Sequence, residues 1–315
     1  MAAALTIAGA SLATQMAHAA SPKVKIYEKG NERCIMSNGV PNHSIGQFPN
    51  AGNPNSFKTQ SLEFCFDKNP QKGSTPTYNT PNVGIALNGI IIRPGTADWY
   101  DASSPRGFSR DRSSGWNLEG MGSASQLGID QNNAHVDNRG LYHYHGPPPN
   151  AVRKGTLIGY AADGFEIHYV GPSAVPSWHL KKGTRPSAPG GQYDGKYLQD
   201  WEHKEGTGNL DQCNGTFSKG KYVYFATETF PFYPRCHFGK VSDDFKLAGG
   251  GQHAGNNNAP ARKGGPLAAA AAELGISEHQ LAQAVGPPPP NVKRAAKILG
   301  ISEAKLRQVL KKHRP

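Results

Sequence analysis

Apolar and polar residues alternate in short runs along most of this chain, and glycine, proline, asparagine or aspartate bounds each run. Successive side chains of a strand point to opposite faces, so such runs predict β-strands with one buried face. Helical periodicity is low throughout this part of the chain. The predicted strands cover residues 24–27, 62–66, 83–92, 141–145, 157–161, 165–169 and 222–227.

Turn residues between these runs favour hairpins. Asp163-Gly164, for example, separates two predicted strands and is a strong hairpin signal. We therefore predict a mainly β fold, an antiparallel sandwich or irregular barrel with long loops, followed by a small C-terminal α-helical repeat. The β domain is predicted to cover residues 21–247.

The pattern changes after residue 247. Residues 248–266 have the Gly/Asn-rich composition of a flexible linker, and residues 267–315 contain two similar copies, 270–281 and 295–306. Each copy predicts a helix, a glycine stop (Gly275, Gly300) and a second helix capped by serine. A small helical hairpin that buries its own apolar residues explains this pattern, and so does a helix-turn-helix unit of the DNA-binding type.

The chain begins with a small, apolar segment that ends in Ala17-His18-Ala19, which fits the rule for signal-peptide cleavage. Residues 1–20 are therefore predicted to be a signal peptide, and the protein is expected to be secreted or periplasmic. No other apolar run approaches the roughly 18–20 residues that a transmembrane helix requires.

Positive charge is concentrated at the C-terminal end. The whole chain has a net charge of +11, and residues 262–315 contribute ten basic and three acidic residues to it. This excess favours polyanions. An exported protein meets anionic envelope or matrix polymers more often than DNA, so we expect such a polymer as partner and consider nucleic acid unlikely.

The four cysteines fit an oxidising compartment, where an even number usually forms disulfides. Three pairings are possible. The clustering along the sequence favours two local bridges, Cys34–Cys65 and Cys213–Cys236. The chain has no Cys-x-x-Cys pair, so thiolate ligation of a metal is not expected.

The strongest chemical signal is the run Tyr142-His143-Tyr144-His145, between Gly140 and Gly146-Pro147. In a strand, His143 and His145 share one face and the two tyrosines share the other. Imidazoles at this spacing can converge on one metal ion if a third ligand approaches from elsewhere.

A third ligand is available on a neighbouring predicted strand. Residues 137–140 form a turn signature, which predicts a hairpin that brings His135 beside His143 and His145. We name His135, His143, His145 and Asp137 as candidate metal ligands. Neutral imidazoles favour transition metals, so Zn or Cu is the expected ion.

Each of these residues also has an interpretation without a metal. A strand histidine can donate to a buried carbonyl, and Asp130 and Asp137 are more often turn formers than ligands. Tyr142 and Tyr144 are expected to pack in the core. His43 is a weaker candidate for a fourth ligand.

The same tetrapeptide resembles the YHYH proteins, a family of mostly exported bacterial proteins. The resemblance extends over roughly residues 34 to 239 and rests on several further segments. These are Asn38-Gly39-Val40-Pro41-Asn42-His43, Ala86-Leu87-Asn88-Gly89, Asp163-Gly164-Phe165, Leu210-Asp211-Gln212-Cys213-Asn214-Gly215 and Phe230-Pro231-Phe232-Tyr233-Pro234-Arg235-Cys236. Two segments depart from the family pattern, Glu166–Tyr169 and Tyr222–Tyr224, so no shared role is assigned to them. The family implies no particular activity.

The chain lacks a nucleophile elbow, a phosphate-binding glycine loop and a dinucleotide fingerprint. The sequence therefore predicts an exported protein with a His-based transition-metal site. The alternatives are a metal-dependent extracytoplasmic enzyme, hydrolase or oxidase, and a structural envelope protein without metal.

One further similarity links two of the predicted strands. Gly140-Leu141-Tyr142-His143-Tyr144 and Gly220-Lys221-Tyr222-Val223-Tyr224 share a Gly-x-Tyr-x-Tyr pattern. Common strand composition explains so short a match, which does not by itself indicate a duplication.

Overall fold

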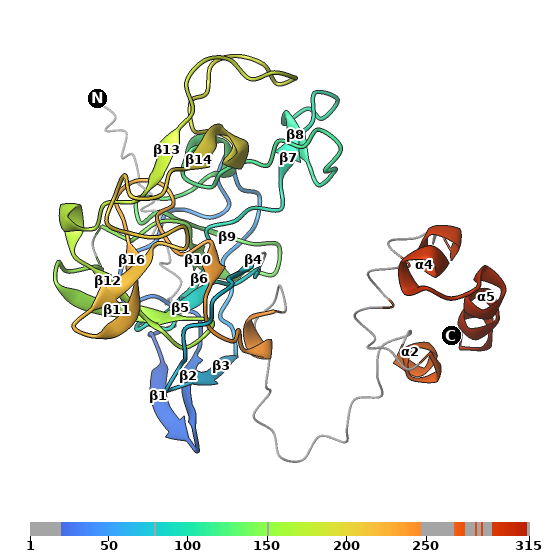
Figure 1. The fold of residues 1–315 in the computed structure, drawn as a ribbon, viewed down its shortest axis with the longest axis horizontal. Helices are drawn as coiled ribbons and strands as arrows, with labels where there is room; N and C mark the ends of the chain where they lie inside the picture. Colours follow the sequence, from blue (N-terminus) through green and yellow to red (C-terminus); the bar gives the residue numbers. More distant parts are fainter. Residues whose placement is uncertain are drawn as a thin grey trace, which may run out of the picture. The chain divides into compact units, whose positions relative to one another are not determined.

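The structure is a computed structural model that describes residues 20–78, 80–149, 151–246, 268–274, 281, 285 and 292–313. The chain divides into two compact units, residues 1–254 and 255–315 (Figure 1). Residues 1–19 of the predicted signal peptide and the whole predicted linker lie outside the described residues.

The first unit is built around an eight-stranded sheet with the strand order β15-β16-β12-β11-β5-β6-β10-β9. Its strands are short and rich in buried β-branched and aromatic residues, as expected for strands covered on both faces. They are β5 (Gly84–Ala86), β6 (Ile91–Ile92), β9 (Ala134–Val136), β10 (Tyr142–Tyr144), β11 (Thr156–Ala161), β12 (Glu166–Tyr169), β15 (Gly215–Ser218) and β16 (Lys221–Ala226).

This sheet is mixed, and the prediction of an antiparallel arrangement is wrong for two of its pairs. β10 lies parallel to β6, and β12 lies parallel to β16. Parallel neighbours need a long connection, and here loops with only short helices and strands in them provide it. None of the sheets among the described residues closes on itself, so the predicted irregular barrel is also wrong. The mainly β class is confirmed.

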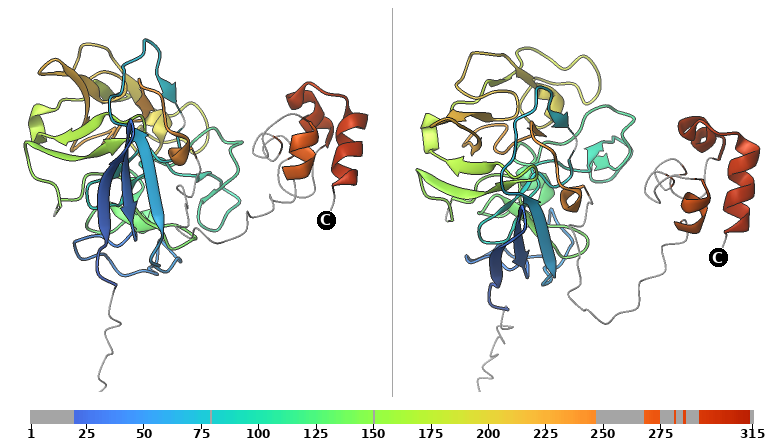
Figure 2. Two further views of the ribbon diagram at one scale, coloured as in Figure 1. Left: turned by 90° about the horizontal axis from the view of Figure 1, so that it is seen from below. Right: turned by 60° about the horizontal axis from the view of Figure 1, so that its bottom comes forward.

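A separate three-stranded antiparallel sheet consists of β1 (Val24–Lys29), β2 (Glu32–Ser37) and β3 (Leu62–Asp67), drawn in blue in Figure 2. Alternate residues of β3 are buried, and Phe64 and Phe66 form one core cluster with Ile85 and Ile91 of the large sheet. The period of two in the sequence thus fixes which face of β3 packs against the large sheet.

The remaining elements of this unit are small and lie in the connections. They are β4 (Thr77–Tyr78) with β17 (Cys236–His237), β7 (Trp99–Tyr100) with β8 (Phe108–Ser109), β13 (Trp178–Leu180) with β14 (Trp201–His203), the helix α1 (Ala124–Leu127), and the 3-10 helices η1 (Gly171–Ser173), η2 (Leu198–Asp200) and η3 (Asp243–Phe245).

Two disulfides fasten this unit. Cys34 and Cys65 are directly opposite on β2 and β3, and Cys213 is bonded to Cys236. Both pairings agree with the prediction. The second bridge ties the loop before β15 to β17, at the end of the first unit.

In the second unit the structure describes α2 (Ala268–Glu273), α4 (Val292–Leu299) and α5 (Glu303–Lys312). Gly300 is in the left-handed conformation, with φ 66°, and Ser302 caps α5 by accepting a hydrogen bond from the amide of Lys305. Most of the second predicted helix of the first copy lies outside the described residues, so the two-copy repeat stays a prediction. No helix among the described residues is long and apolar enough to cross a membrane.

Candidate metal centre

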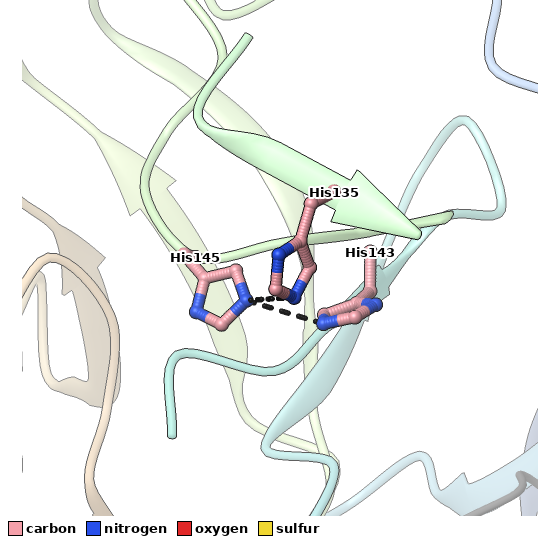
Figure 3. Close-up of side chains that lie close together, drawn as sticks. All are labelled: His135, His143 and His145. Atoms are coloured by element: carbon pink, nitrogen blue, oxygen red, sulfur yellow. Dashed lines mark hydrogen bonds between the residues drawn. The ribbon is translucent and has the colours of Figure 1, made fainter. Parts of the chain in front are cut away.

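Three histidines meet at the edge of the large sheet. His135 of β9 is directly opposite His143 of β10, and His145 follows β10 on the same face as His143. All three imidazoles converge in Figure 3. The hairpin between β9 and β10 produces this arrangement as the alternation in the sequence predicts, because residues two apart on a strand share a face.

The three Nε2 atoms point toward a common centre. Nε2 of His145 lies 3.1 Å from Nε2 of His135 and 3.2 Å from Nε2 of His143. Two nitrogens bound at about 2.0–2.1 Å to a tetrahedral metal ion lie about 3.3–3.4 Å apart. The separation of the imidazoles is therefore close to that of a ligand set.

Main-chain carbonyls orient the three rings. Nδ1 lies 2.9 Å from the oxygen of Leu127 for His135, 3.1 Å from that of Leu141 for His143, and 3.3 Å from that of Pro94 for His145. A carbonyl oxygen only accepts, so each Nδ1 donates a proton and each neutral Nε2 presents a lone pair. Carbonyl contacts of this kind are the usual outer shell of a metal-bound histidine.

The environment keeps these imidazoles neutral. Burial lowers the pKa of His135, and it lowers the pKa of His143 and His145 well below the usual value. The nearby guanidinium of Arg93 acts in the same direction on all three. His143 and His145 are only 2% and 1% exposed. At neutral pH the cluster offers three unprotonated nitrogens, the form that binds metal.

Asp137, the fourth predicted ligand, is not part of this group. Its carboxylate lies 3.0 Å from Arg93 and 3.1 Å from Arg139, and it also accepts the backbone N–H groups of Arg139 and Leu141 in the β9–β10 turn. Its place in the structure is that of a turn former and ion-pair partner. Among the described residues, no other His, Cys, Asp or Glu joins the three histidines.

Two features near the cluster were not found from the sequence. Gly120 lies against His145, and a Cβ at this position would be 2.2 Å from Nδ1 of that ring. Beside it, buried Glu119 binds Arg235 at 2.6 Å. These contacts join segments far apart in the chain, and no local motif marks them.

The tyrosines of the motif lie on the opposite face, as predicted. Tyr142 and Tyr144 are fully buried in the main core cluster. The hydroxyl of Tyr142 donates to Asp130 at 2.8 Å, and the hydroxyl of Tyr144 lies 2.6 Å from Nε2 of His43. His43 and Asp130 therefore interact with the tyrosine face, away from the three histidines.

Two further groups have other roles. Asp163 is buried and accepts hydrogen bonds from the hydroxyl of Tyr224 and the amide of Gly239. Glu32 lies close to Cys34 and Cys65, but the disulfide between these cysteines leaves no thiolate for a metal.

The fold and this cluster define a disulfide-bonded, mainly β protein with a three-histidine group on a Tyr-His-Tyr-His strand. The model of the YHYH protein family matches residues 63–239, more than half of the chain, and the chain belongs to this family. The resemblance seen in the sequence is thereby confirmed. Comparisons with curated proteins and with solved structures found no match.

Proposed function

We propose that this protein binds a transition-metal ion through His135, His143 and His145. The observation that supports the proposal is the convergence of three Nε2 lone pairs while every Nδ1 donates to a carbonyl. Three acceptor nitrogens this close repel one another unless a cation or a proton lies between them. Burial disfavours the proton, which leaves a metal ion as the better partner.

The donor set limits the metal. Neutral imidazole nitrogens suit Zn and Cu, whereas Ca and Mg prefer oxygen ligands. We therefore propose Zn or Cu. The two disulfides are compatible with an oxidising compartment, and we propose that the protein is secreted or periplasmic. The basic C-terminal segment is proposed to contact an anionic envelope or matrix polymer.

A metal-dependent enzyme is the second candidate. The observation that favours it is the number of ligands: three histidines supply three protein ligands, and Asp137 is held by Arg93 instead. Catalytic zinc sites have three protein ligands and an open position for water, whereas structural sites have four. An open position would let the metal activate water or oxygen.

The test is elemental analysis of the purified, untagged mature protein after loading with Zn or Cu. We expect about one metal ion per chain, and we expect its loss in a His143→Ala/His145→Ala variant. The matched control is His168→Ala/His179→Ala, which removes two imidazoles outside the cluster and should keep the metal. A wild-type protein that holds no metal after loading, or a cluster variant that keeps it, would contradict the proposal.

A further inference from the structure

The order of strands in the large sheet is the same when counted outward from its centre in either direction. The central pair is β5 and β11, which are antiparallel. Next to each lies its own hairpin partner, β6 or β12, then a parallel strand, β10 or β16, and last an antiparallel edge strand, β9 or β15. The sheet thus consists of two four-stranded half-sheets with one topology, the first made of β5, β6, β10 and β9 and the second of β11, β12, β16 and β15.

The register at the centre obeys a twofold relationship. Ile85 is opposite Tyr160, and the hydrogen bond from the amide of Leu87 to the carbonyl of Ile158 is 2.9 Å long. A shift of 75 residues converts this bond into one from Ala162 to Val83, and that bond exists, also at 2.9 Å. Every antiparallel pair has reciprocal bonds of this kind, and in this pair they are consistent with the 75-residue offset that also separates the turns Asn88-Gly89 and Asp163-Gly164.

The hairpins beside this axis also correspond. The turn after β5 has Asn88-Gly89 and the turn after β11 has Asp163-Gly164, with both glycines at positive φ, 76° and 92°. In the first half-sheet Asn88 Nδ2 donates to the hydroxyl of Tyr144 at 2.8 Å, and in the second half-sheet the hydroxyl of Tyr224 donates to Asp163 at 2.8 Å. Each turn therefore fixes the second tyrosine of its own parallel strand.

The outer hairpins share a more detailed motif. Asp130 begins one loop and Asp211 the other, and each is followed by Gln-x-Asn. The asparagines, Asn133 and Asn214, are both left-handed, with φ 57° and 64°. Each aspartate accepts a hydrogen bond from the amide two residues later through Oδ1.

The first tyrosine of each parallel strand completes this motif. Tyr142 donates to Asp130 at 2.8 Å and Tyr222 donates to Asp211 at 2.7 Å. The pairing with the neighbouring strand is also the same, because Tyr144 is opposite Ile92 and Tyr224 opposite Ile167, which is residue 92 shifted by 75. Common strand composition does not produce so many matched contacts.

We infer that the sheet is built from two copies of one four-stranded arrangement. We further infer that the second half-sheet contains a latent counterpart of the metal site, with Thr216, Val223 and Phe225 at the ligand positions. Thr216 is opposite Val223 on β15 and β16, as His135 is opposite His143 on β9 and β10. Phe225 follows Val223 by two residues, as His145 follows His143. This inference rests on the proposed function of the first site.

The counterpart position has space for ligands. A cavity of about 170 Å³ is lined by Thr216 and Phe225, together with Leu210 and other residues. Imidazole is smaller than the phenyl ring of Phe225, and the cavity gives rings at positions 216 and 225 room to turn, whereas Val223 is buried and does not line it. The half-sheet of β11, β12, β16 and β15 also shows that this strand arrangement forms without histidines at the three ligand positions.

The test introduces three histidine ligands into the second half-sheet with Thr216→His/Val223→His/Phe225→His in the full chain. We expect the bound Zn or Cu, measured by elemental analysis, to rise from about one to about two ions per chain. Combined with His143→Ala/His145→Ala, the same three substitutions should leave about one ion per chain, now bound by the second half-sheet. Circular dichroism and the thermal midpoint show whether each variant is folded.

A folded triple variant that binds no additional metal, beside a wild type that binds one ion, overturns the inference and leaves the proposed function intact. A wild type without metal overturns the proposed function and the inference with it. If the triple variant does not fold, Val223→His/Phe225→His provides the test, because a strand pair at this spacing chelates Cu(II) weakly. A folded pair variant that takes up no copper beyond the wild type also overturns the inference.

Discussion

Arg93 binds the carboxylate of Asp137 at 3.0 Å beside the three histidines, and both side chains are only 14% exposed. Removal of one partner from a buried ion pair leaves an uncompensated charge. We expect Asp137→Asn to lower the free energy of unfolding by about 2 kcal/mol, less than a full loss because the amide oxygen still accepts a hydrogen bond. The metal content should not change, since Asp137 does not face the imidazoles. Urea denaturation and elemental analysis measure the two effects, and a loss of metal would instead identify Asp137 as a ligand.

The effect of this substitution should depend on pH. Burial would raise the pKa of Asp137, but Arg93 and the backbone N–H of Arg139 outweigh it, and the pKa is lowered overall. A lowered pKa in the folded state stabilises the protein above the unfolded value, about 3.9, and this contribution disappears as pH falls through the folded pKa. The difference between wild type and Asp137→Asn should therefore be large at neutral pH and shrink under acid conditions. Denaturation curves at several pH values test this, and a difference that grows toward acid would contradict it.

A side chain at position 120 should disturb the metal site. The Cβ of Gly120→Ala would approach Nδ1 of His145 within 2.2 Å, so the ring or the backbone must move. Overpacking of this kind costs about 1–3 kcal/mol, and the displaced imidazole should weaken metal binding by about tenfold or more. Gly95→Ala is the matched control, because a Cβ there meets nothing within 4 Å. Metal titration followed by competition with a chelator measures the change, and equal affinities of the two variants would contradict it.

The two framework tyrosines should contribute similarly to stability. Tyr142 and Tyr222 each donate one hydrogen bond to an aspartate of the preceding loop. Loss of a hydrogen bond to a charged group costs about 1.5–3 kcal/mol. We expect Tyr142→Phe and Tyr222→Phe each to lower the free energy of unfolding within that range, while both variants keep the metal. A Tyr142→Phe variant that loses its bound metal while its free energy of unfolding falls only within that range would mean that the tyrosine acts on the histidines directly.

Removal of the metal should lower the thermal stability of the protein. A ligand that binds only the folded state at a free concentration of 100 times its Kd adds about 2.7 kcal/mol. Treatment with a chelator should therefore lower the thermal midpoint of the wild type, and it should leave the thermal midpoint of the His143→Ala/His145→Ala variant unchanged. Differential scanning calorimetry makes this comparison, and an equal shift in both proteins would show that the chelator acts elsewhere.

Local features of the site could be predicted from the sequence. The alternation around His143 and His145 fixed their common face, and the turn at 137–140 placed His135 beside them. Both depend on residues within a few positions of one another. The ion pair of Asp137 with Arg93 and the packing of Gly120 on His145 could not be predicted, because the partners lie 44 and 25 residues apart in the chain.

The parallel pairs and the duplication escaped prediction for a related reason. Which strand lies beside β10 depends on the path of long loops, and the spacing of side chains along β10 is the same for either neighbour. The two half-sheets share few identical residues, such as the aspartates at 130 and 211 and the tyrosines at 142 and 222. Only their hydrogen bonds make the correspondence plain.

The use of main-chain carbonyls to orient the imidazoles has a consequence for how the site can change over generations. A change in one codon can replace a side chain that positions a ring. The main-chain carbonyls of Leu127, Leu141 and Pro94, in contrast, are present whatever residues occupy those positions. The ring tautomers are thus insulated from most drift in the surrounding sequence. Variation in metal use among relatives with this hairpin should arise from the three ligand codons themselves, which makes those codons the informative positions for comparing them.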